Sequence, residues 1–186
     1  MKLIITFIII LISLTNPIKA NSNKDLKDLL KEGKKLIFIR HAYAPGTGDP
    51  ENFNIKDCTT QRNLNNEGIN ESKLLNIFFL NNKISIDKVL SSEWCRCKDT
   101  AFYAFHNYEK KSFLNSFYDK KFYHKKTKQI IELKDYIKKW NGRNNLVLVT
   151  HYVVISEILN IGALPAEIII ADKDFNVLAR KKLKNN

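Results

Sequence analysis

Two arginines and two histidines of this chain carry the chemistry of a phosphoryl-transfer site: Arg40, His41, Arg96 and His151. A neutral imidazole nitrogen can attack phosphorus and form a covalent intermediate. The attack leaves negative charge on the phosphoryl oxygens, and fixed cations aimed at those oxygens lower the barrier. Arginine suits this role because its planar guanidinium matches phosphate geometry and stays charged. This chemistry requires neither a metal ion nor another cofactor.

Three short segments must position these side chains. Residues 36–39 and 146–149 are apolar and too short for helices, which is typical of buried strands in a parallel sheet. Residues 88–92, with Val89 and Leu90, are expected to form a further strand. Each segment is followed within a few residues by Arg96 or by one of the two histidines. In open α/β sheets, ligands bind beyond the carboxyl ends of the strands. We therefore expect the four side chains to meet at one edge of the sheet.

Helical patterns alternate with these strands. Apolar residues recur at helical spacing in four segments, 69–80, 95–107, 127–140 and 153–161. Two final strands are expected at 166–171 and 176–183, and the Gly- and Pro-containing segment 44–60 is expected to be a loop. This alternation predicts a single three-layer α/β/α domain with a mostly parallel central sheet.

Four motifs occur in the order in which they occur in a known group of enzymes. They are Arg40-His41-Ala42, Leu64-Asn65-Asn66-Glu67-Gly68, the stretch from Ser91 to Ala101, and Val149-Thr150-His151. They resemble the Arg-His-Gly signature, the Leu-Xaa-Xaa-Xaa-Gly helix start, the Ser-Xaa-Xaa-Xaa-Arg-Xaa-Xaa-Xaa-Thr-Ala pattern and the third segment of the histidine phosphatase superfamily. That superfamily includes the phosphoglycerate mutases, and the resemblance spans residues 36–155. It implies a phosphoglycerate mutase-like fold and a small, exported, bacterial-type member.

The resemblance also implies roles for individual residues. His41 is the expected nucleophile, phosphorylated during turnover, and Arg40, Arg96 and His151 are expected to bind the phosphoryl group. Arg62, which precedes a helix, is expected to add a phosphate or substrate contact. The implied partner is a small phosphorylated substrate, and no metal or cofactor is implied.

The sequence departs from the family pattern at two points. Ala42 replaces the signature glycine, at a modest cost unless that residue needs a positive φ. The leaving oxygen also needs a proton donor. One branch of the family carries an acid directly after the second histidine, where this chain has Tyr152; the other has a Glu near the position of Ser116. Asp119 is therefore the expected general acid, with Glu167 as the alternative.

The first 20 residues have the pattern of a secretory signal peptide, with Lys2, an apolar run over 3–14 and Ala20 before the expected cut. An uncleaved anchor is the alternative. The phosphatase domain is then expected over residues 21–186, in the periplasm or secreted, with no stable membrane insertion once the signal is removed.

The charge and the cysteine content restrict which ligands and which disulfide pairings we expect. The net charge is +12, but the lysines are spread along the chain and no zinc-finger or RNP-type motif occurs, so nucleic acid is not an expected partner. The three cysteines allow at most one intramolecular disulfide, from Cys58 to either Cys95 or Cys97. The oligomeric state does not follow from the sequence.

Several functions fit these patterns. The leading interpretation is a metal-independent phosphomonoester phosphatase acting through a phosphohistidine on His41. A mutase is disfavoured because the chain has no long insertion for a lid that excludes water. A phosphatase acting on phosphohistidine in proteins, and a non-catalytic module that binds phosphate or sugar phosphate, remain alternatives.

Overall fold

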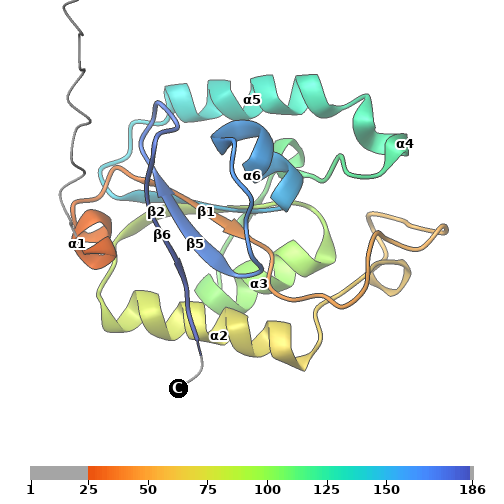
Figure 1. The fold of residues 1–186 in the computed structure, drawn as a ribbon, viewed down its shortest axis with the longest axis horizontal. Coiled ribbons are helices and arrows are strands. Elements are labelled where there is room, and N and C mark those ends of the chain that lie inside the picture. Colours follow the sequence, from red (N-terminus) through yellow and green to blue (C-terminus); the bar gives the residue numbers. More distant parts are fainter. Residues whose placement is uncertain (1–24, 185–186) are drawn as a thin grey trace, which may run out of the picture.

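The computed structural model describes residues 25–184 (Figure 1). The elements in chain order are α1 (Leu26–Lys31), β1 (Leu36–Arg40), η1 (Cys58–Thr60), α2 (Asn66–Asn81), β2 (Ile86–Ser91), α3 (Cys95–Phe105), β3 (Glu109–Lys110), η2 (Ser112–Leu114), α4 (Lys120–Tyr123), α5 (Lys126–Lys139), β4 (Asn145–Thr150), α6 (Tyr152–Leu159), β5 (Glu167–Ala171) and β6 (Val177–Lys182). The signal peptide expected over residues 1–20 lies outside the described residues. Within them, no helix combines the length and the apolar character needed to cross a membrane.

One sheet of six strands organises these elements, in the order β3-β2-β4-β1-β5-β6. β3, β2, β4 and β1 pair in parallel, and β5 and β6 add antiparallel strands at the β1 edge. The predicted α/β fold with a mostly parallel central sheet is confirmed. The predicted strands at 166–171 and 176–183 are β5 and β6, whereas the two-residue β3 was not predicted because it has no pattern of its own.

Helices cover both faces of the sheet: α5 and α6 lie on one face, and α2 and α3 on the other (Figure 1). Alternate residues of β1 enter different cores. Ile37 and Ile39 pack on the α2 side, while Leu36 and Phe38 pack on the α5 side. β4 alternates in the same way, so the segments Leu36–Ile39 and Leu146–Val149 are apolar and buried on both faces. A slip of one residue would exchange the two faces, so the register of the central strands is firmly specified.

This register brings the chemistry-bearing residues to one edge. Arg40 pairs with Thr150, and Ser91 pairs with Val149, at the carboxyl ends of β1, β2 and β4. The His41 N–H donates to the Thr150 carbonyl at 2.8 Å, which continues the ladder one residue beyond β1. The three loops that follow these strands therefore leave the sheet side by side.

The helix-start motif is explained by a close approach. At Gly68, an added Cβ would stand 2.0 Å from the carbonyl oxygen of Tyr43, which belongs to the segment directly after His41. Asn65 caps α2, and its side chain accepts the Gly68 N–H at 3.0 Å. The glycine thus allows the first turn of α2 to press against the segment that carries the histidine.

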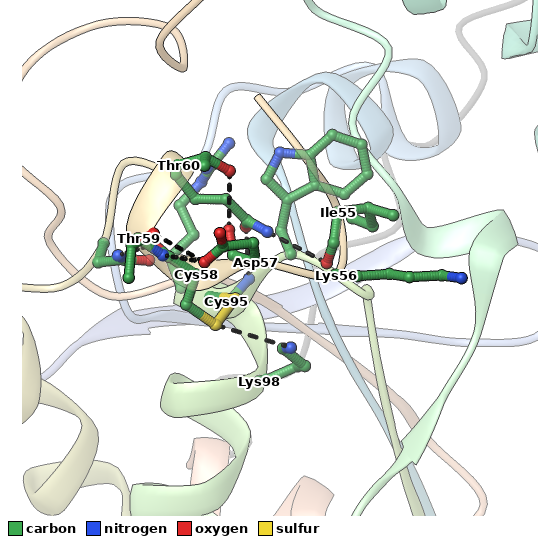
Figure 2. Close-up of a disulfide and its surroundings, with 12 residues drawn as sticks. Ile55, Lys56, Asp57, Cys58, Thr59, Thr60, Cys95 and Lys98 are labelled. Carbon is green, nitrogen blue, oxygen red and sulfur yellow. Dashed lines mark hydrogen bonds between the residues drawn. A yellow bond between two sulfur atoms is a disulfide. The ribbon is translucent and has the colours of Figure 1, made fainter. Parts of the chain in front are cut away.

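A disulfide joins Cys58 to Cys95, so the structure decides between the two pairings that the sequence left open (Figure 2). It ties η1 to the first residue of α3, directly before Arg96. Gln61 reinforces this junction, because its side-chain oxygen accepts the Cys95 N–H at 2.9 Å. Cys97 is free and buried.

Removal of the bridge should destabilise the protein. Its two cysteines are 37 residues apart in sequence, and a closed loop of that length corresponds to about 4 kcal/mol of lost chain entropy in the unfolded state. We expect Cys58→Ser to lower the free energy of unfolding in urea by roughly that amount. A reductant should lower the stability of the original protein similarly and leave the variant unchanged. Equal unfolding midpoints for the two oxidised proteins would contradict this expectation.

Candidate active site

A cavity of about 200 Å³ opens at the carboxyl edge of the sheet. It is lined by Arg40, His41, Gly46, Thr47, Gly48, Asp49, Arg62, Trp94, Arg96, Ser116, Tyr118, Asp119, Phe122, His151 and Tyr152. Every side chain of the predicted site thus lies on one cavity, although they come from five separate parts of the chain. Glu167, the alternative acid, is absent from its lining.

His41 is held with one ring nitrogen ready to react. Its side chain is 3% exposed, and Nδ1 lies 2.8 Å from the carbonyl oxygen of Ala42. A carbonyl can only accept, so Nδ1 carries the hydrogen and Nε2 keeps its lone pair. Burial, and next the nearby Arg96 cation, hold the pKa of His41 well below its ordinary value. The imidazole is therefore neutral at pH 7, as a nucleophile must be.

Ala42 is accommodated without strain. It is not among the residues of positive φ in the described chain, and its N–H donates to the Thr100 hydroxyl at 2.9 Å. The hydroxyl of Thr100 in turn donates to the Arg96 carbonyl at 2.7 Å. Thr100 thus links the nucleophile segment to α3, which explains the threonine of the second motif.

Arg96 lies directly against His41. Its Nε–H points at His41 Nε2 over 3.3 Å, and its terminal nitrogens form a two-pronged ion pair with Asp49, at 2.7 and 3.2 Å. Nη1 also donates to the Arg62 carbonyl at 3.3 Å. Of the five N–H groups of a guanidinium, this leaves Nε–H and one hydrogen of Nη2, which share an edge. That edge is the pair of donors available to a phosphoryl group at His41.

Asp49 is a site residue that the sequence did not reveal. Its carboxylate accepts from Arg96, from the Arg62 N–H at 3.1 Å and from the Trp94 indole at 3.0 Å. Burial alone would raise the pKa of Asp49, but these donors outweigh burial and lower it. Asp49 is therefore ionised and fixes the orientation of Arg96. The aspartate stands 47 residues before Arg96 in an irregular loop, and no local pattern marks it.

Arg40 and Arg62 complete the cationic wall. Arg40 donates through Nη1 to the Ala163 carbonyl at 2.9 Å, while its Nε is buried without a hydrogen-bond partner. Arg62 donates through Nε to the Gly48 carbonyl at 2.8 Å and through Nη1 to the Ala44 carbonyl, so it also holds the loop after β1. Burial lowers the pKa of both guanidinium groups, yet arginine stays protonated at neutral pH.

His151 closes the inner side of the cavity. Its ring is 3% exposed, and its centroid lies 5.4 Å from that of His41. Nε2 lies 2.9 Å from the Ser92 hydroxyl oxygen. Burial and then Arg96 hold the pKa of His151 well below its ordinary value. His151 is also the N-cap of α6, and Arg96 lies in the first turn of α3, so two helix N-termini face the cavity and favour an anion there.

The two candidate acids have different surroundings. Asp119 lies on the cavity rim, 44% exposed, where it caps α4 by accepting the Lys121 N–H at 3.0 Å. Glu167 is 4% exposed and accepts two hydrogen bonds from Arg180, at 2.7 and 2.8 Å. Burial alone would raise the pKa of Glu167, but Arg180 and the Leu164 N–H together lower it. Glu167 is thus an ionised partner of Arg180, whereas Asp119 lies on the cavity rim beside Lys121 Nζ at 3.7 Å.

No set of three or more His, Cys, Asp or Glu side chains within residues 25–184 is arranged to hold a metal ion. The cavity instead offers arginine donors and imidazole nitrogens, which suit an oxyanion.

Comparison with solved structures identifies the fold. The chain is similar to the protein histidine phosphatase SixA complexed with tungstate, with a TM-score of 0.52 and 16% identity over 77% of this chain and 92% of the other. It is also similar to a phosphoglycerate mutase from Thermus thermophilus, with a TM-score of 0.58 and 14% identity over 81% and 99%. The chain therefore has a phosphoglycerate mutase-like fold. No protein-family model and no curated protein matches the sequence.

The two neutral histidines should make stability depend on pH. A histidine whose pKa is lowered in the folded state binds more protons when unfolded. Its stabilising contribution is therefore complete above the unfolded pKa of about 6.5 and declines as the pH falls below it. For both residues together the loss approaches about 2.7 kcal/mol per pH unit.

We expect urea unfolding measured from about pH 6.5 down to about pH 5 to show this slope. His151→Gln should roughly halve the slope. His124→Gln, which removes an exposed imidazole, serves as the control and should keep it. A stability that is flat over this range would contradict the neutral assignment of the two rings.

Proposed function

We propose that this chain is a member of the histidine phosphatase superfamily that hydrolyses phosphomonoesters through a phosphohistidine on His41. The observation that carries the proposal is the lone pair of His41 Nε2 beside the Nε–H and Nη2 edge of Arg96, inside a cavity walled by further arginines. The fold that the chain shares with SixA and with a phosphoglycerate mutase supports the same conclusion.

The first half-reaction forms the phosphohistidine. His41 Nε2 attacks phosphorus, and the bond from phosphorus to the ester oxygen breaks. Arg40, Arg62 and Arg96 stabilise the charge that develops on the phosphoryl oxygens. Asp119, in its protonated form, gives its proton to the leaving oxygen, so an alcohol departs.

The second half-reaction regenerates the enzyme. Water attacks phosphorus, the bond from phosphorus to His41 Nε2 breaks, and its electron pair returns to the imidazole. The water proton passes to the Asp119 carboxylate, which restores the acid, and inorganic phosphate leaves. In this cycle Asp49 holds Arg96 in place.

The proposed substrate is a small phosphorylated molecule outside the cytoplasm. A cavity of about 200 Å³ accommodates a phosphoryl group and a small part of the leaving group. The disulfide between Cys58 and Cys95 supports an oxidising compartment, as does the signal-like pattern of the first 20 residues. Sugar phosphates, headgroup esters of phospholipids and scavenged organic phosphate all fit this description.

Phosphohistidine on a protein is the second candidate substrate. The likeness to a structure named as a protein histidine phosphatase favours it. The proposed export disfavours it, because phosphohistidine-bearing partners are cytoplasmic. Ranking phosphohistidine against a panel of phosphate esters by kcat/KM separates the two candidates.

His41 is the first residue to test. We expect the protein to hydrolyse para-nitrophenyl phosphate between about pH 4 and pH 8 in the presence of EDTA. His41→Ala should abolish the reaction, and His106→Asn, which changes an exposed histidine at the end of α3, should retain it. Hydrolysis that survives in His41→Ala would exclude the phosphohistidine. Phosphate binding without any hydrolysis would instead favour the non-catalytic module.

Two aspartate variants test the acid. Asp119→Asn should lower kcat for glycerol phosphate by about 10²–10⁴-fold, because an alkoxide cannot leave without a proton. It should affect para-nitrophenyl phosphate much less, because nitrophenolate leaves unprotonated. Asp49→Asn should slow both substrates, because it releases Arg96 from its position. The reverse outcome, with glycerol phosphate alone impaired in Asp49→Asn, would assign the acid to Asp49.

A further inference from the structure

A partly buried polar chain lies behind His151, and the proposed reaction does not use it. Its members are Ser92, Glu93 and Asn115. Asn115 Oδ1 accepts the Glu93 N–H at 2.8 Å, and Asn115 Nδ2 donates to the Glu93 carboxylate at 2.6 Å. A backbone N–H can only donate and a carboxylate can only accept, so both ends of the Asn115 amide are assigned.

The orientation of Asn115 determines the direction of the next hydrogen bond. Asn115 Oδ1 also lies 3.1 Å from the Ser92 hydroxyl, and because Oδ1 is an acceptor, Ser92 must be the donor. Ser92 has only one hydroxyl hydrogen. Its oxygen must therefore accept from the Trp94 N–H at 3.3 Å and from His151 Nε2 at 2.9 Å. It follows that His151 Nε2 carries a hydrogen.

Cys97 fits the assignment that Ser92 requires. Its sulfur lies 3.6 Å from the Thr150 carbonyl and 3.5 Å from His151 Nε2. Burial raises the pKa of Cys97 to about 12, so it stays a thiol with one hydrogen. Because Ser92 already requires a hydrogen on His151 Nε2, the thiol hydrogen goes to the Thr150 carbonyl and the sulfur accepts from Nε2.

The two histidines consequently hold opposite tautomers. His41 has its hydrogen on Nδ1 and its lone pair on Nε2. His151 has its hydrogen on Nε2, and the nitrogen left to contact a ligand is Nδ1, which in the neutral ring has only a lone pair. A lone pair repels an oxyanion, whereas an N–H binds it.

We propose that Ser92 is a positioning residue that holds His151 in the Nε2–H tautomer, so that an oxyanion enters the cavity together with a proton that binds His151 Nδ1. The second part of this inference rests on the proposed function, because it requires an oxyanion site; the tautomer does not. Binding of substrate would thereby convert His151 from a neutral ring into a cationic hydrogen-bond donor. An arginine cannot change in this way, because it is charged before the ligand binds.

The surroundings explain why the proton comes only with the ligand. The charged and titratable groups that face His151 or line its cavity come from β1, the loop after β1, α3, segment 116–122 and α6. They are Arg40, His41, Asp49, Arg62, Arg96, Cys97, Tyr118, Asp119 and Tyr152. The cations Arg96, Arg62 and Arg40 disfavour a further positive charge in the free protein. A bound dianion reverses that balance.

The tautomer can be measured directly. Long-range ¹H–¹⁵N spectra distinguish the protonated from the unprotonated nitrogen of each neutral imidazole. We expect His151 of the free protein to show a hydrogen on Nε2. Ser92→Ala should introduce the Nδ1–H form. Ser91→Ala is the matched control, since the neighbouring buried hydroxyl donates to the Ser92 carbonyl instead. A wild-type His151 with its neutral hydrogen on Nδ1 would overturn the proposal without need of any variant.

The coupled proton is measured with tungstate as the oxyanion. Tungstate takes up no proton itself near neutral pH, so titration calorimetry in buffers of different ionisation enthalpy counts the protons taken up by the protein. We expect uptake approaching one proton, with Kd rising by up to about tenfold per pH unit between about pH 6 and pH 8. In Ser92→Ala both effects should shrink, and in Ser91→Ala both should persist.

The outcomes separate the inference from the proposed function. Tungstate binding without proton uptake would overturn the coupling and leave the phosphatase intact. Uptake on His41 Nε2 instead of His151 Nδ1, visible in the same spectra, would also overturn the coupling. Absence of tungstate binding would refute the oxyanion site, and with it the coupling, while the spectra would still decide the tautomer.

Discussion

The contact between Arg96 and His41 is the constraint on which the rest of the site depends. A guanidinium that is 3% exposed and lies 3.3 Å from a neutral imidazole must be compensated, because an unpaired buried charge costs several kcal/mol. Asp49 supplies the opposite charge. The long loop after β1 must therefore return to the start of α3, and much of the local structure serves that return. Arg62 holds the loop by donating to backbone carbonyls of the loop. The disulfide between Cys58 and Cys95 anchors the far end of the loop beside Arg96.

The same concentration of cations determines the state of both histidines. His41 and His151 are buried beside Arg96, so each is neutral in the free protein. For His41 this neutrality is the requirement of nucleophilic attack. For the proposed coupling, it means that the His151 ring would contribute little to holding an anion until a proton arrives. On that proposal the arginines provide permanent binding, and the second histidine provides binding that responds to the ligand and to pH.

The sequence predicted the parts of this structure that local patterns encode. The runs at β1 and β4 are apolar throughout because both strands are buried on two faces, and their ends place Arg40, His41 and His151. Gly68 is informative because a Cβ there would collide with Tyr43.

The features that the sequence did not predict are contacts between residues that only the folded chain brings together. Asp49 has no helical or strand periodicity around it, and its partner lies 47 residues away. The choice between Cys95 and Cys97 was open for the same reason, and so were the different surroundings of Asp119 and Glu167. The turn of α3 directs Cys95 toward η1 and Cys97 toward His151, and only the pairing of β5 with β6 reveals that Arg180 neutralises Glu167.

The cavity combines two walls of different origin, and Asn115 joins them. The phosphoryl side consists of strand ends and helix starts, which the central sheet holds rigidly. The open side comes from the segment after η2, where Tyr118 is 52% exposed, and loops of this kind carry substrate preference in folds that host many activities. The Asn115 side chain belongs to the polar chain behind His151, and its carbonyl accepts the Gln129 side chain of α5 at 2.8 Å. The segment after η2 is therefore fastened through Asn115 to Ser92, which contacts His151. If the proposed function and tautomer hold, a leaving group that displaced this segment would also change the protonation of His151.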